Sequence, residues 1–122
     1  MEELLKKLRA LAKDDVIKEI CGDRVFMNNR NKKVQLPYVS YNPVITANTI
    51  VHSKNKLAEL ILERYVTQVN FYCKNDYNFT IACNRIKKVM CNNGFKCEPY
   101  FVDTTDEGNT WICFRFSINI WA

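Results

Sequence analysis

Few side chains in this sequence have the types and spacing that suit chemistry. The single histidine, His52, lies in a polar run with Ser53 and Lys54 and belongs to no catalytic motif. Catalysis needs a nucleophile, a base and an orienting group within reach of one another. The sequence also lacks the glycine-rich phosphate loops and the nucleophile elbow of common enzymes. We therefore expect a protein that is not an enzyme and has no cofactor.

Two groups of residues have ligand chemistry without the spacing of a metal site. Asp103, Asp106 and Glu107 lie close together but lack the alternating ligands and central glycine of a calcium loop, so they predict an exposed hairpin tip. The cysteines are never spaced as CxxC, as structural zinc requires. We expect no metal site and mostly buried free thiols, with Cys97 and Cys113 as candidates for neighbours on adjacent strands. The cysteines are Cys21, Cys73, Cys83, Cys91, Cys97 and Cys113.

Aromatic and basic residues make the remaining candidate surface. Single-strand nucleic-acid binders stack bases on aromatic rings and line the path with cations. The net charge of +5 permits a polyanionic partner without requiring one. No RRM signature or KH loop is present, and such rings also pack against another protein. The apolar surface and a long edge strand favour assembly. The residues concerned are Arg64, Val66, Tyr72, Trp111, Arg115 and Trp121.

Hydrophobic periodicity predicts the elements that position these side chains. Residues 2–21 read as helix, with a second short helix at Val16–Cys21 capped by Asp14 or Asp15 and closed by Gly22. Another helix is expected at 76–92, capped by Asn75 or Asp76 and ended by Gly94. Period-two patterns predict extended segments at 25–26, 36–42, 62–73, 95–102 and 110–121, with an irregular insertion at 43–55.

This order predicts one α+β domain over residues 1–122, an antiparallel sheet of about four strands packed against two main helices. No apolar run approaches the roughly 20 residues that span a bilayer. The charged N-terminal segment is unlike a signal peptide, so we expect a protein that is cytosolic where it is made and does not enter a membrane.

Several motifs together resemble the tail-completion, or tail-terminator, proteins of long-tailed bacteriophages. An amphipathic start, LRALAKDDVIKEI, leads to Gly22-Asp23-Arg24-Val25-Phe26 and, after a polar spacer, to Leu36-Pro37-Tyr38-Val39-Ser40-Tyr41. A central strand, RYVTQVNFYCKN, precedes a helix ending at Asn93-Gly94-Phe95. An acidic hairpin and an aromatic strand, DTTDEGNTWICFRFSINIW, complete the resemblance, which covers nearly the whole chain.

The resemblance implies a structural protein of the virion neck, present in the host cytoplasm during assembly. Such proteins form a hexameric ring that ends tail-tube polymerisation and joins tail to head. The implied partners are further copies of the chain, the tail-tube protein and a head connector or head-closure protein. Genome DNA would pass through the ring without sequence recognition.

The candidate subunit or partner contacts combine residues from several elements. Segment 43–56, read as a long loop, is expected to reach the tail tube or the connector. Two alternatives remain: another neck or minor capsid component, and a single-strand nucleic-acid-binding module. The candidate residues are Tyr41, Lys54, Lys56, Arg64, Tyr72, Trp111, Arg115 and Trp121.

Overall fold

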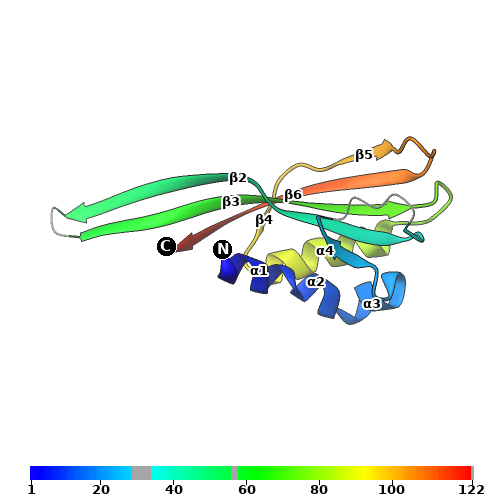
Figure 1. Ribbon diagram of the computed structural model, residues 1–122, viewed down its shortest axis with the longest axis horizontal. Coiled ribbons are helices and arrows are strands. Elements are labelled where there is room, and N and C mark those ends of the chain that lie inside the picture. Colours follow the sequence, from blue (N-terminus) through cyan, green and yellow to red (C-terminus); the bar gives the residue numbers. More distant parts are fainter. Residues whose placement is uncertain (29–33, 56–57, 122) are drawn as a thin grey trace.

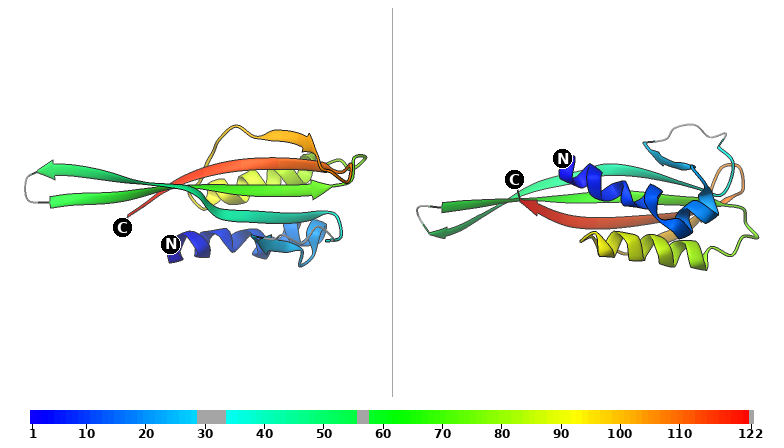
Figure 2. Two further views of the ribbon diagram at one scale, coloured as in Figure 1. Left: turned by 45° about the horizontal axis from the view of Figure 1, so that its top comes forward. Right: turned by 90° about the horizontal axis from the view of Figure 1, so that it is seen from below.

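Helices and strands form two layers in the computed structural model, which describes residues 1–28, 34–55 and 58–121, with the backbone alone at 51–55 and 58–61. The helices are α1 (Glu2–Leu8), α2 (Ala10–Lys13), α3 (Asp15–Cys21) and α4 (Thr80–Asn92). The strands are β1 (Val25–Met27), β2 (Tyr38–Asn55), β3 (Ala58–Cys73), β4 (Lys96–Cys97), β5 (Phe101–Thr104) and β6 (Thr110–Trp121). All the described helices cover the same face of the sheet (Figure 1 and Figure 2).

The sheet corrects the predicted fold class in size and in strand direction. Its order is β1-β2-β3-β6-β4, and β5 pairs with β6 beside β4. β1 runs parallel to β2, whereas the other pairs are antiparallel. The prediction of an antiparallel sheet of about four strands is therefore wrong, because the described sheet is mixed and has six. The predicted strand 95–102 is divided into β4 and β5, and three helical segments, not one main helix, precede the sheet.

The hydrophobic core lies between the helices and the sheet. The buried faces predicted for the two central strands, β3 and β6, are confirmed, but Asn70, Cys113 and Ser117 on the opposite face are buried as well. The apolar stripe of α4 is confirmed in the same way. The largest side chains with almost no exposed surface include Leu4, Leu8, Leu11, Ile17, Phe71, Ile86, Met90, Ile112, Phe114 and Phe116.

Asp14 joins the N-terminal helices to α4. Its carboxylate accepts the N–H groups of Val16 and Ile17, at 3.1 and 3.0 Å, which confirms the predicted cap of α3. It also binds the guanidinium of Arg85 in α4 through both oxygens, at 2.7 and 2.9 Å. The Asp14 side chain is only 8% exposed. The hydrogen bond from Arg85 is the main reason that the pKa of Asp14 lies below its ordinary value.

Replacing Asp14 should make the stability of the fold less dependent on acid pH. Because its folded pKa is lowered, the carboxylate stabilises the fold fully above its unfolded pKa, about 4, and this contribution disappears as the pH falls through the lower folded pKa. We expect Asp14→Ala to cost about 1 kcal/mol at neutral pH through the lost cap. Asp14→Asn keeps an acceptor and is the control for charge. Urea unfolding at pH 7 and pH 3 measures both, and an equal wild-type advantage at both values would contradict the assignment.

The predicted irregular insertion at 43–55 is wrong, because these residues continue β2. The strand bulges between Asn42 and Thr46, where its register against β3 shifts. There the buried hydroxyl of Thr67 donates to the carbonyl oxygen of Pro43 at 2.7 Å. The side-chain bond satisfies a backbone acceptor at the bulge, so the strand accommodates proline and resumes pairing.

β2 and β3 form a hairpin that extends past the rest of the molecule. β6 pairs with β3 only over Leu62–Cys73, so the β3 backbone at 58–61 pairs with β2 alone. In Figure 1 this two-stranded arm reaches beyond the helices and both chain ends. A strand of 16 residues such as β3 spans roughly 50 Å. A two-stranded ribbon is only marginally stable in water by itself, so contact with a partner would stabilise the arm.

The segment before α4 also differs from expectation. The helix begins at Thr80, and its N-cap, Phe79, makes no side-chain cap. Asn75, a predicted cap, instead donates to the carbonyl oxygen of Gly108 and accepts from the hydroxyl of Thr110. It therefore holds the acidic β5–β6 turn against the end of β3.

Candidate functional site

A row of aromatic side chains crosses the sheet on the face without helices. Tyr38 in β2 stacks on Tyr72 in β3, with ring centroids 4.7 Å apart and planes inclined by 20°. Tyr72 and Trp111 in β6 are also stacked, at 6.3 Å and 6°. Phe26 and Phe101 close the two ends with edge contacts to Tyr38 and Trp111 at 6.2 and 5.4 Å. These five residues, the aromatic row, connect β1, β2, β3, β6 and β5.

A buried amide supports the middle of the aromatic row. Asn70, 4% exposed, accepts the indole N–H of Trp111 at 2.9 Å and the side-chain amide of Gln68 at 3.0 Å through the same oxygen. Burial and the neighbouring Tyr38 and Cys113 raise the pKa of Tyr72 to about 12. The tyrosine therefore stays neutral at physiological pH. The aromatic row is packed and mainly apolar, with the side-chain amide of Asn70 beneath its middle.

The geometry of the aromatic row does not suit base stacking. A ring that reads a base must present its π-face to solvent. In Tyr38, Tyr72 and Trp111 the faces are directed at one another, and Tyr38 is only 9% exposed. Tyr38, Tyr72 and Trp111 therefore pack against one another within the sheet. Of the aromatic residues considered for base stacking, Trp121 is exposed.

The candidate contact residues do not form one site. Tyr72 and Trp111 lie in the aromatic row, whereas Tyr41 is 9% exposed and belongs to the core, so it is unsuited to a partner contact. Trp121 at the end of β6 is 60% exposed. Arg115 is exposed opposite Gln68 in the register of β6 and β3.

Three of the basic candidates give little information about a partner contact. Arg64 lies 3.5 Å from Glu98, which also accepts from the hydroxyl of Ser117. Lys54 lies in β2 at the register shift between Ser53 and Asn55, but its side chain lies outside the described residues, and so does all of Lys56.

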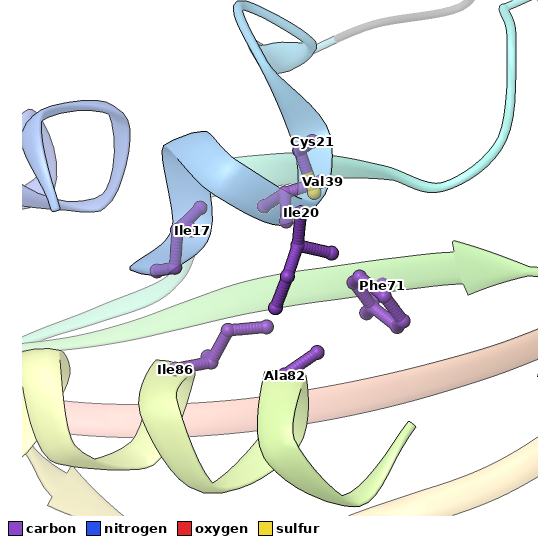
Figure 3. Close-up of a pocket in the computed structure, with 7 residues that line it drawn as sticks. All are labelled: Ile17, Ile20, Cys21, Val39, Phe71, Ala82 and Ile86. Carbon is purple, nitrogen blue, oxygen red and sulfur yellow. The ribbon is translucent and has the colours of Figure 1, made fainter. Parts of the chain in front are cut away.

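Two pockets lie among the described residues. The space between α3, α4 and the sheet is lined by apolar side chains and leaves no room for a water molecule (Figure 3). Its lining is Ile17, Ile20, Cys21, Val39, Phe71, Ala82 and Ile86. A more open depression beside α3, of about 400 Å³, combines Lys18 and Asp23 with Ala12, Gly22 and Val25.

The cysteines divide into buried and accessible thiols. Cys21, Cys73, Cys83 and Cys113 are buried, as predicted, and burial raises the pKa of each, to about 11 for Cys21 and Cys83. Cys91 is exposed. The expected proximity of Cys97 to Cys113 is not a direct pairing, because Cys97 lies opposite Phe116 and Cys113 opposite Phe101. Within the described ranges, no three potential ligands gather as a metal site.

The exposed apolar residues that sequence reasoning missed gather at β5. Tyr100, Phe101 and Val102 are consecutive and 45, 45 and 50% exposed. Tyr100 lies on the helix side, 5.0 Å from the ring of Phe114 and under the ammonium group of Lys87. The sequence signal was present in this short apolar run, but it was read as the end of one longer strand.

Comparison with protein-family models and with curated proteins finds no match for this chain. In the described part of the chain, no helix has both the length and the apolar character needed to cross a membrane.

Proposed function

We propose that this chain is a structural protein of the neck of a long-tailed phage or prophage, a tail terminator that forms a ring at the head-proximal end of the tail. The observation that carries the proposal is the β2–β3 arm, a ribbon that leaves the core and pairs with no other described strand at its end. Such a ribbon, with exposed strand edges, is suited to contact between protein subunits.

The sequence motifs supply the position in the virion. The GDRVF and LPYVSY elements resemble the tail-terminator family, and here they are adjacent parallel strands, β1 and β2. An assembly role of this kind needs no turnover. The partners in this proposal are further copies of the chain, six in the ring by analogy with the family, the tail-tube protein, a head connector or head-closure protein, and DNA that passes without sequence recognition.

Electron microscopy of particles made with this gene disrupted tests the position. Filled heads beside detached tails of abnormal length support a tail terminator. Tails of normal length beside leaking, unjoined heads would move the protein to the head side of the neck. Intact infectious particles would contradict a role in the neck altogether.

The arm should be sensitive to charge reversal at Lys54 and Lys56. The segment 43–56 has these two lysines and no acidic residue, so Glu at both positions changes the sign of its charge. We expect Lys54→Glu with Lys56→Glu to impair head–tail joining while circular dichroism and the thermal midpoint stay those of the wild type. The matched control, Lys74→Glu with Lys88→Glu, makes the same charge change at two exposed positions outside the arm. Normal joining by the arm variant would exclude the arm from this contact.

A further inference from the structure

Two strand edges on opposite sides of the sheet have no described partner. β1 covers β2 only at residues 39–41, so the outer edge of β2 is unpaired from Thr46 to Ile50. On the other side, β5 pairs with β6 along one edge, and its outer edge is unpaired. Figure 1 shows β5 at the border of the molecule.

The hydrogen-bond pattern shows which β2 groups point outward. The N–H of Val39 donates to the carbonyl oxygen of Arg24, so the backbone N–H and C=O of Val39 point away from β3. The backbone groups of its partner, Phe71, therefore point toward β6. The direction in which the backbone N–H and C=O groups point alternates from one residue to the next along a strand. The β3–β6 register is continuous, so the backbone groups of Glu63 also point toward β6. Thr49, the β2 partner of Glu63, therefore directs its N–H and C=O away from the sheet.

The same reasoning orients β5. The N–H of Thr105 donates to the carbonyl oxygen of Asn109 at 2.7 Å, which continues the β5–β6 ladder into the turn. The backbone groups of Thr105 therefore face β6, and by alternation those of Thr104 and Val102 are directed outward. The N–H of Thr104 donates to the carboxylate of Asp103 at 2.8 Å, so Val102, not Thr104, offers the outward N–H of β5. Each edge thus offers donors and acceptors to another strand.

Neither edge has the protection that is usual for an exposed strand. Natural edges are commonly blocked by lysine, proline or a bulge. The run Thr46-Ala47-Asn48-Thr49-Ile50 has no charge and no proline, and the β2 bulge lies before it. β5 has one acidic residue, Asp103. Its first two residues, Phe101 and Val102, and the preceding Tyr100 have exposed apolar side chains.

We propose that these edges pair with each other between copies of the chain, the β2 edge of one copy against the β5 edge of the next. The segments that contain the two edges have opposite charge, since segment 43–56 has two lysines and no acid, and segment 101–110 has three acids and no base. Because the edges differ and lie on opposite sides, the contact is head-to-tail, and its repetition closes a ring or extends a filament. This contact specifies how the subunits of the proposed ring would join. It rests on the self-association in the proposed function, although not on the position of the ring in the virion.

Proline at one outward position of each edge tests the pairing. Thr49→Pro removes an outward donor from β2, and Val102→Pro removes one from β5, while the inward ladders keep theirs. We expect the wild type to form oligomers by native mass spectrometry and sedimentation, and each proline variant to be a monomer. Mixed together they should form a one-to-one heterodimer, because the first retains its β5 edge and the second its β2 edge. Thr49→Ala and Val102→Ala, which keep the N–H, should assemble like the wild type.

Other results would overturn the inference. A proline variant that dimerises alone would indicate an edge pairing with its own copy. Oligomers of both variants would place the contact elsewhere, and a wild type that is monomeric at millimolar concentration would show that the edges do not pair. Circular dichroism verifies the fold, and Thr49→Lys with Val102→Lys repeats the test if proline unfolds either variant. If the variants form heterodimers but particles made without the gene are intact, the edge pairing is upheld and the neck position is rejected. If the variants do not pair but particles made without the gene show separated heads and tails, the neck position is upheld and the edge pairing is rejected.

Discussion

Replacing Phe114 with alanine is expected to lower the free energy of unfolding by about 3–5 kcal/mol. Its side chain has no exposed surface and lies in the middle of β6, stacked at 5.9 Å on Phe116 and contacting Tyr100 at 5.0 Å. Removing the ring loses its burial and leaves a cavity between the sheet and α4. Because small domains are stable by only about 5–15 kcal/mol, this is a large share of the total.

Chemical denaturation of Phe114→Ala and Ile81→Ala measures the effect. Ile81 is 67% exposed on α4, so its truncation is an apolar control that leaves the core unchanged. We expect the control to stay within about 0.5 kcal/mol of the wild type, as surface substitutions usually do. Equal losses for the two variants would contradict the central position of Phe114 in the core.

The second large effect is expected at Trp111, where alanine should cost about 2–3 kcal/mol. The indole is half-buried, stacks on Tyr72, meets Phe101 edge-on and donates to Asn70. Stability is lost because the aromatic contacts disappear and because the buried oxygen of Asn70 keeps only the Gln68 amide of its two hydrogen-bond donors. Trp111→Phe keeps a ring and should lose about 1 kcal/mol, mainly the hydrogen bond.

A double-mutant cycle separates the row from its single members. If Tyr72 and Trp111 stabilise each other, the loss for the pair of alanine substitutions differs from the sum of the single losses by about 0.5–1.5 kcal/mol. Additive losses would mean that the two rings are independent. Unfolding by urea provides all four values under one condition.

Local signals in the sequence predicted the elements with strong patterns. β6 alternates over its whole length, and the stripe of α4 repeats at helical spacing, so both were predicted with the correct buried face. Gly22 was predicted at the C-terminal end of α3 from capping chemistry alone, and Asp14 was one of two predicted caps, with Asp15 as the other. In these cases neighbouring residues determine the structure, and no distant contact needs to be known.

The errors concern features that depend on distant contacts. Pro43 and the polar residues after it suggested a loop, but pairing with β3 and the Thr67 hydroxyl stabilise a strand there. Tyr41 was chosen as a surface contact because its pairing was unknown, and opposite Val69 it belongs to the core. Tyr72 and Trp111 were placed on one surface from the sequence, but Tyr38 was missed for the same reason, since only the register of β2 and β3 sets it beside Tyr72.

The distribution of thiols gives the chain a built-in reporter of its own folding. Four cysteines are buried with raised pKa, whereas Cys91 is exposed on α4, so a maleimide should modify Cys91 first in the native protein. Cys73 and Cys113 lie in the two central strands and Cys21 and Cys83 in the helices. Their labelling rates, read peptide by peptide, would time the opening of each layer separately without any introduced probe.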